Sequence, residues 1–343
     1  MAPMIKLRLL CSVLCLWCTA HAAHAWTPDC AKAIAVNWQA VAPGVWVWLP
    51  KRPGKIFEDH KGQMLPVTAI VSASKALVVD PGPSHEHGLR VRISLACQLG
   101  AEVRWVVNTH AHAESVLGNS AFADLQALGR LNIAATAGTR DAMQRRCEQC
   151  LAYLIGTVGA ETMRGTKIVL PNRILSDGEI LTVGRIRLQV MEIRNAYTES
   201  DLLLWEPQRR LLLAGGLLYE GRIPELAQGN LNGWLNALPR LTAMRPAVVV
   251  STTLSVAKDA SALPSILGAT QHYLQALRIS VLKAMDAGLD ASDTRSLQLP
   301  DYAHWAGYRQ RHGLNIQRAW LELEPEWLDA VATPSASIPE VRR

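Results

Sequence analysis

The chain has 343 residues, of which 49% are hydrophobic and 19% are charged. This hydrophobic share excludes an intrinsically disordered protein and is sufficient for a sizeable core. The formal net charge of +6 does not indicate a nucleic-acid-binding protein, because no block of Lys and Arg and no basic stripe with interleaved aromatic residues occurs.

The first 25 residues have the three parts of an export signal. Lys6 and Arg8 form a positive start, Leu9–Trp17 is apolar apart from one serine, and Ala23-His24-Ala25 has the small-x-small pattern of a cleavage site. The apolar run is too short to span a bilayer as a helix, and no later stretch reaches that length. We therefore expect an exported protein, periplasmic or secreted, that begins near Trp26 with no membrane span in the mature chain; a retained N-terminal anchor is the alternative. Removal of the signal would lower the net charge to +4, since it holds two basic residues and no acidic one.

Strands and helices alternate through the first half of the remaining chain. Alternating or β-branched runs predict strands over residues 45–49, 68–72, 76–79 and 103–107. Ser84 follows Pro81-Gly82-Pro83 and is placed to cap a helix that ends near Leu99. A further helix is expected over residues 137–158.

The second half repeats this order. Strands are predicted over residues 173–175, 185–193, 202–205, 210–213 and 247–250, with a helix over 231–244. A long helix should start near Ser261, and another should cover residues 314–331. Two similar halves of this kind predict an α/β protein in which two sheets lie between helices. The tail over 333–343 is rich in Pro and Ser, and we expect it to be disordered.

Four of the seven cysteines would remain after removal of the signal, namely Cys30, Cys97, Cys147 and Cys150. An even number in an oxidising compartment predicts two disulfides, but four cysteines allow three pairings. Cys147 and Cys150 would pair with each other, or each would join Cys30 or Cys97. Their CxxC spacing is also that of a redox pair or of half a zinc knuckle, although no second CxxC would remain after removal of the signal.

The residues that carry metal chemistry directly follow the predicted strand over 103–107. His110-Ala111-His112 places two imidazoles two residues apart, and Glu114 adds a carboxylate two residues later. Two histidines and one acidic residue are suitable ligands for zinc, and a loop at a strand end can bring them to one ion.

Four segments of the sequence resemble the metallo-β-lactamase-fold hydrolases. They are the strand that ends in Asp80-Pro81-Gly82, VVNTHAHAESVLGN (Val106–Asn119), AYTESDLLLW (Ala196–Trp205) and LLLAGGLLYEGRIPEL (Leu211–Leu226), which LNGWLNAL follows. The last two are most similar to an exported branch associated with quinoprotein oxidation, the quinoprotein relay system zinc metallohydrolases. The resemblance implies an αββα sandwich, here a domain over 26–260 with a helical C-terminal extension over 261–332 packed on it.

In that family seven positions hold two zinc ions, and this chain departs from the pattern. It keeps His110 and His112 and has Glu114 in place of an aspartate. The other four ligand positions hold Ser115, Tyr197, Gly216 and Thr253, while Asp80 and Asp201 are kept nearby. Gly216 stands where the family has the aspartate that bridges the two ions. Without its cations such a carboxylate would be a buried, uncompensated charge, so loss of metal would favour losing the carboxylate too.

We therefore expect an accessory or binding protein without hydrolytic activity and without a cofactor. Its partner would be a small molecule or a periplasmic protein, for instance of a quinoprotein system. The alternative is a hydrolase with a single zinc ion on His110, His112 and Glu114, since a catalytic zinc needs only three protein ligands. Thiol exchange at Cys147 and Cys150 is a third possibility.

Overall fold

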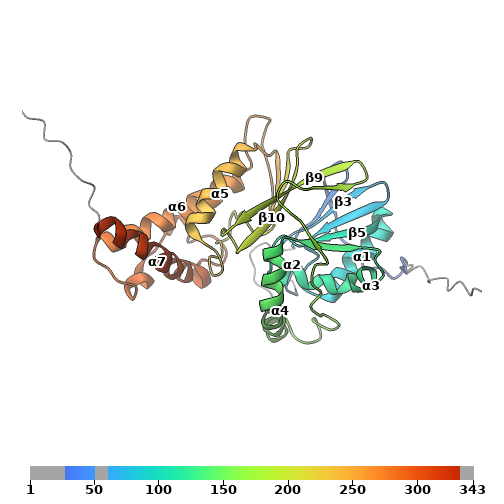
Figure 1. The fold of residues 1–343 in the computed structure, drawn as a ribbon, viewed down its shortest axis with the longest axis horizontal. Helices are drawn as coiled ribbons and strands as arrows, with labels where there is room; N and C mark the ends of the chain where they lie inside the picture. Colours follow the sequence, from blue (N-terminus) through green and yellow to red (C-terminus); the bar gives the residue numbers. More distant parts are fainter. Residues whose placement is uncertain (1–27, 51–60, 333–343) are drawn as a thin grey trace, which may run out of the picture.

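The computed structural model describes residues 28–50 and 61–332 (Figure 1). The predicted export signal and the tail over 333–343 lie outside the described residues. Within the described ranges, no helix is long and apolar enough to cross a membrane.

The first sheet has seven strands in sequence order: β1 (Gln39–Ala42), β2 (Val45–Trp48), β3 (Val67–Ser72), β4 (Lys75–Val79), β5 (Glu102–Val107), β6 (Asn132–Ala135) and β7 (Arg173–Ile174). Its first four strands pair antiparallel, and β4 to β7 pair parallel. The parallel part requires crossover helices, which are α1 (His85–Leu99) and α4 (Ala137–Val158) together with the short segments α2 (Ala113–Val116), η1 (Leu117–Phe122) and α3 (Ala123–Ala127).

The second sheet runs in the order β13-β12-β11-β10-β9-β8. Its strands are β8 (Ile180–Val183), β9 (Ile186–Arg194), β10 (Ser200–Glu206), β11 (Leu211–Leu213), β12 (Val248–Val250) and β13 (Leu254–Val256). Only β11 and β12 pair parallel, because α5 (Leu231–Ala243) connects them. The helices α6 (Ser265–Asp286) and α7 (Tyr308–Ala332) follow, separated by the short turns η2 (Asp293–Ser296) and η3 (Pro300–Tyr302).

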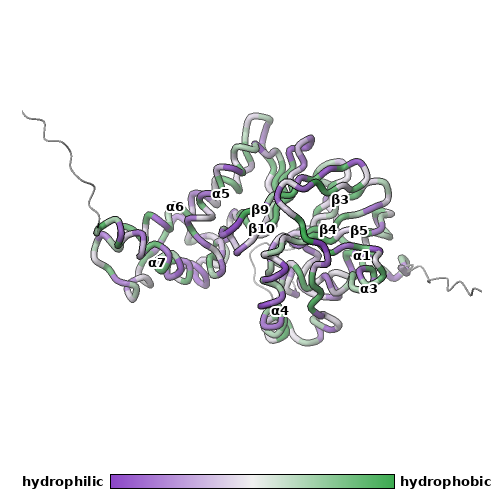
Figure 2. Tube along the Cα trace, viewed as in Figure 1, coloured by the Kyte–Doolittle hydropathy of each residue, from purple (hydrophilic) through white to green (hydrophobic). Residues whose placement is uncertain are grey.

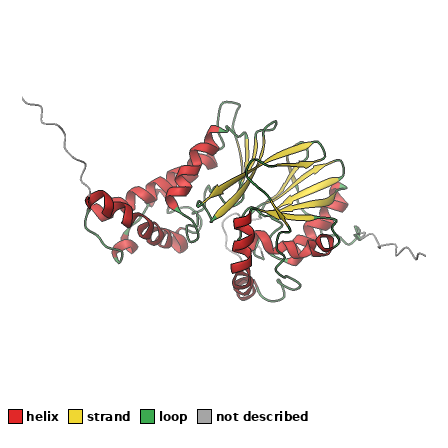
Figure 3. Cartoon of the chain, viewed as in Figure 1, coloured by secondary structure: helices red, strands yellow, loops and turns green. Residues whose placement is uncertain are grey.

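The two sheets lie face to face between layers of helices, as the sequence predicts (Figure 3). Ile70 and Leu77 of the first sheet share one apolar cluster with Leu188 and Leu202 of the second, which forms the middle of the sandwich. A second cluster places α1 on the outer face of the first sheet. The third places α5 and part of α6 against the second sheet, with α7 packed on α6 (Figure 2). The predicted α/β sandwich with C-terminal helices is confirmed.

The element boundaries differ in a few places from those predicted. The helix expected from Ser261 begins at Ser265, because Pro264 precedes it and holds an extended backbone. The last helix begins at Tyr308 instead of residue 314, since His312 and Tyr308 are buried against neighbouring helices. The short strands β1, β6, β8 and β13 were not predicted from the sequence, and three of them, β1, β8 and β13, are sheet edges.

The four cysteines in the described part of the chain form one disulfide instead of the two expected. Cys30 is bonded to Cys97, which ties the N-terminal segment to α1, whereas Cys147 and Cys150 are free thiols. Both free cysteines lie on α4, but Cys147 packs with Val116 and Met143 and Cys150 packs in a different apolar cluster. Burial raises the pKa of Cys147 to about 12, which is the opposite of the lowered pKa that a redox-active thiol requires.

Peptide mapping without reduction should therefore find the Cys30–Cys97 crosslink and two alkylated residues, Cys147 and Cys150. The Cys97→Ala variant should lose about 2–4 kcal/mol of unfolding free energy, because the crosslink spans a long stretch of chain. Denaturant melts measure this loss. Cys150→Ala is the matched control and should change stability much less. A Cys147–Cys150 disulfide in the mapped peptides would contradict the prediction.

Candidate functional site

The loop that carries the two histidines is held between the two sheets. Strand β5 ends at Val107, and the side chains of Asn108 and Asn119 exchange two hydrogen bonds of 3.0 and 2.8 Å across the loop. The carbonyl of Thr109 accepts a hydrogen bond of 2.7 Å from the amide of Leu202, which lies on β10 of the second sheet. These hydrogen bonds therefore fix the loop residues after Thr109 at the edge where the two sheets meet.

His110 is buried and makes hydrogen bonds at both ring nitrogens. Asp80 accepts from the amide and the hydroxyl of Thr109 at 2.9 and 2.6 Å. Because that hydroxyl donates to Asp80, it accepts from Nδ1–H of His110, at 2.7 Å. Nε2 is then the acceptor for the hydroxyl of Ser115, at 3.3 Å. Burial lowers the pKa of His110 to about 3 and raises that of Asp80 to about 7.

His112 lies between a tyrosine and a glutamine. Its Nδ1 is 2.7 Å from the hydroxyl of Tyr197, and its Nε2 is 3.2 Å from Oε1 of Gln228. The carboxylate of Glu114 lies 3.5 Å from the same Nδ1. Burial opposes the charged form of Glu114 and of His112, but their attraction prevails, so the pKa of His112 is raised and that of Glu114 is lowered to about 2.

The ring of Tyr197 fills the space beside both histidines. Its centroid lies 4.9 Å from that of His112 and 5.2 Å from that of His110, and its far side contacts Trp234 at 5.4 Å. A Cβ atom at Gly216 would lie only 2.2 Å from Cε1 of this ring. Only glycine therefore fits at position 216 while Tyr197 holds this place. Burial raises the pKa of Tyr197 well above its ordinary value.

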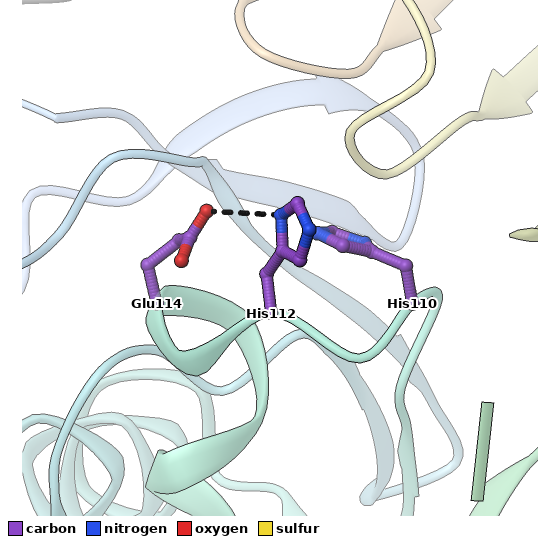
Figure 4. Close-up of side chains that lie close together, drawn as sticks. All are labelled: His110, His112 and Glu114. Carbon is purple, nitrogen blue, oxygen red and sulfur yellow. Dashed lines mark ion pairs between the residues drawn. The ribbon is translucent and has the colours of Figure 1, made fainter. Parts of the chain in front are cut away.

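The structure brings together some of the residues that the sequence singled out, but not all of them. One nitrogen of His110, one of His112 and one oxygen of Glu114 lie within 4.8 Å of one another and could hold a metal ion (Figure 4). Asp201 instead accepts hydrogen bonds from the amide and the hydroxyl of Thr198 at the start of β10. Thr253 is half-buried, and its carbonyl closes a turn with the amide of Ser251.

A pocket of about 310 Å³ opens beside the candidate metal group. His112, Glu114 and Cys150 line it, together with Glu225 and Arg311, which form an ion pair. Gln228 also lines it and fixes His112. Gln228 and Glu225 were not predicted from the sequence. Glu225 lies at the end of the segment Leu211–Leu226, and Gln228 lies just past it. Arg311 was not predicted because this residue comes from α7, about 200 positions after the histidines.

The sequence model of the metallo-beta-lactamase superfamily matches residues 65–253, and no curated protein matches the chain. Among solved structures, the chain is similar to the metallo-beta-lactamase from Pontibacter korlensis, with a TM-score of 0.54 and 17% identity over 70% of this chain and 99% of that one. It is also similar to VMB-1, with a TM-score of 0.52 and 13% identity over 71% of this chain and 97% of that one. At these identities the two structures support the fold alone, but the superfamily model covers more than half of the sequence, and the chain therefore belongs to the metallo-beta-lactamase superfamily.

Proposed function

We propose that this protein is an exported, non-hydrolytic member of the metallo-beta-lactamase superfamily, which binds a small molecule and serves as an accessory protein in quinoprotein oxidation. The observation that carries the proposal is the position of Tyr197, whose ring lies against His110 and His112 and leaves no room for a side chain at Gly216.

The residues do not fit the pair of zinc ions that the superfamily implies. At the four replaced positions, Gly216 offers no donor, and Ser115 and Thr253 offer only neutral hydroxyls. Tyr197 would have to lose its proton to bind zinc well, but burial raises its pKa and its hydroxyl is bonded to His112. Removing the bridging carboxylate also removes a charge that would be buried without a counterion.

The pocket beside His112 supports binding of a small molecule. Its volume of about 310 Å³ is at the lower end of the range for ligand sites. Glu114 and the Glu225–Arg311 pair give it polar groups that can orient a ligand. A ligand there would contact the same His112 ring that Tyr197 and Gln228 hold in place.

Export and the link to quinoproteins rest on different observations. The pattern of the first 25 residues supports export, and the Cys30–Cys97 disulfide is typical of proteins in oxidising compartments. The segments Ala196–Trp205 and Leu211–Leu226 support the quinoprotein association. Adjacency of the gene to those of a quinoprotein dehydrogenase and its cytochrome tests this association directly.

A second candidate function is a hydrolase with one zinc ion. It is favoured by the donor atoms of His110, His112 and Glu114, which lie within 4.8 Å of one another. These three residues would hold the ion, which would lower the pKa of a bound water and make it a nucleophile. The two imidazoles would first have to give up their hydrogen bonds to Ser115 and Tyr197.

Zinc content separates the two functions. Protein purified without chelators and without a histidine tag should contain far less than one zinc ion per chain by elemental analysis, because hydrogen bonds to Ser115 and Tyr197 engage the imidazoles of His110 and His112. It should also fail to hydrolyse β-lactams, thioesters and acyl-lactones. Stoichiometric zinc that disappears in the His110→Ala, His112→Ala double variant would favour the single-zinc hydrolase instead. As a positive control, the combined variant Ser115→His, Tyr197→His, Gly216→Asp, Thr253→His should gain zinc binding.

Gly216→Ala tests the steric role of Tyr197. The added methyl group would overlap the tyrosine ring, so this variant should lose about 1–3 kcal/mol of unfolding free energy in denaturant melts. In a Tyr197→Ala background the same substitution should cost close to nothing, because the obstructing ring is gone. Gly268→Ala is the matched control, since the nearest atom to a Cβ there lies 3.8 Å away. Equal costs in both backgrounds would show that the ring does not occupy this space.

N-terminal sequencing tests export. Protein recovered from the native host should begin at or near Trp26, because the signal is expected to be cleaved after Ala25. Intact protein that starts at Met1 in the cytoplasm would refute export and, with it, the periplasmic role.

A further inference from the structure

Polar side chains on one side of α7 hold the loop that precedes α5. They are Arg311, Asn315, Arg318 and Glu322, and intervals of four, three and four residues place them on the same side of the helix. The loop that they reach spans residues 224–230, contains no helix or strand, and lies about 90 residues earlier in the sequence.

Asn315 bonds this loop with both ends of its side-chain amide. Its Oδ1 accepts a hydrogen bond of 3.0 Å from the amide of Leu226, and its Nδ2 donates to the carbonyl of Pro224 at 2.7 Å. Nδ2 also donates to the hydroxyl of Tyr273 on α6, at 3.0 Å. Only 2% of Asn315 is exposed, so water cannot replace these partners without a structural change.

The other end of the loop is held by the next two residues of the set. Nη2 of Arg318 donates to the carbonyl of Gly229 at 3.2 Å. The carboxylate of Glu322 accepts from the amides of Leu231 and Asn232 at 2.7 and 2.8 Å. These two amides begin α5 and have no acceptor within that helix, so Glu322 joins the start of α5 to α7.

Gln228 lies between these two fixed points, and its side chain reaches the candidate site. Its Oε1 accepts from Nε2–H of His112 at 3.2 Å, because an amide oxygen has no hydrogen to donate. The loop also carries Glu225, which α7 holds through the ion pair with Arg311. All four residues line the pocket of about 310 Å³. Helix α7 thus contributes one pocket residue and holds the loop that contributes two more.

Docking of α7 on the molecule does not require an asparagine at position 315. Ile316, Ala319 and Leu323 already belong to the apolar cluster that includes α5 and α6. A buried amide is costly unless it is fully bonded, and an apolar side chain of similar size would pack the helix equally well. The contacts of Asn315 with the loop are therefore the reason for an amide at this buried position.

We propose that α7 is a positioning element of the pocket, in which Asn315 holds the loop so that Gln228 bonds His112. Asn315 is a positioning residue, because it acts through the loop and does not line the pocket itself. This role rests on the proposed function, since the pocket is where the small molecule would bind. The bond between Gln228 and His112 can be measured without a ligand, however, so a failure to find a ligand would count against the proposed function alone.

Nuclear magnetic resonance of the histidine rings tests this role in the full chain. With isotope-labelled histidine, the Nε2–H proton of His112 should give a signal that is absent from the His112→Gln variant. Gln228→Leu shows how this signal changes when its acceptor is lost. Asn315→Leu should change the signal in the same way and speed up exchange of the proton with water by about 10-fold or more, because two hydrogen bonds that hold the loop are lost.

Tyr273→Phe is the matched control for a merely structural effect. It removes the hydroxyl that accepts from Asn315 and bonds His312, but it leaves every contact with the loop, so the signal of His112 should stay as in the wild type. Arg318→Met loses one contact with the loop and should change the signal in the same direction by less. Circular dichroism checks folding, and Arg318→Met decides the matter if Asn315→Leu does not fold. An unchanged signal in the folded variants of α7, or an equal change in Tyr273→Phe, would overturn the proposal.

Discussion

The contact between the Tyr197 ring and the two histidines determines what this site can be. The ring lies about 5 Å from each imidazole, its hydroxyl bonds Nδ1 of His112 at 2.7 Å, and its edge occupies the space that a side chain at Gly216 would need. A tyrosine at 197 thus requires glycine at 216, and glycine has no side chain that could bind a metal ion. The identities of residues 197 and 216 are therefore coupled, because the tyrosine ring excludes any side chain at position 216. The aromatic contacts to Trp234 and Tyr219 then connect this ring to the core between α5 and the second sheet.

The sequence predicted the fold well because periodic and local signals determine most of it. Ser84 caps α1 as expected, and α4 covers the predicted range of 137–158. The start of α7 was misjudged because its first turns are buried by contacts distant in sequence, including a hydrogen bond between His312 and the hydroxyl of Tyr273 on α6. The cysteine pairing also depends on distance in space. Cys147 and Cys150 are close in sequence, yet they face different apolar clusters, whereas Cys30 meets Cys97 across 67 residues.

The candidate site was predictable in its members but not in its contacts. The HxHxE spacing identified His110, His112 and Glu114, and the structure does bring their donor atoms within 4.8 Å. The spacing could not show that Ser115 and Tyr197 form hydrogen bonds to these imidazoles, since such contacts depend on loop geometry. Nor could it identify Gln228 and Arg311, which reach the pocket from segments more than 100 residues away.

The retention of His110 does not require a metal ion. Its Nδ1 donates to Thr109, whose hydroxyl donates to Asp80 and whose carbonyl accepts from Leu202 of the second sheet. Its Nε2 accepts from Ser115 at the start of the crossover toward β6. Removal of this imidazole would leave a buried hydroxyl of Ser115 without its acceptor, and unpaired buried polar groups are costly. His110 thus connects the end of β4, the loop after β5 and α2 as a neutral imidazole, since burial holds its pKa at about 3. The imidazole of His110 therefore contributes to the structure of this loop through its own hydrogen bonds, without the need for a metal ion.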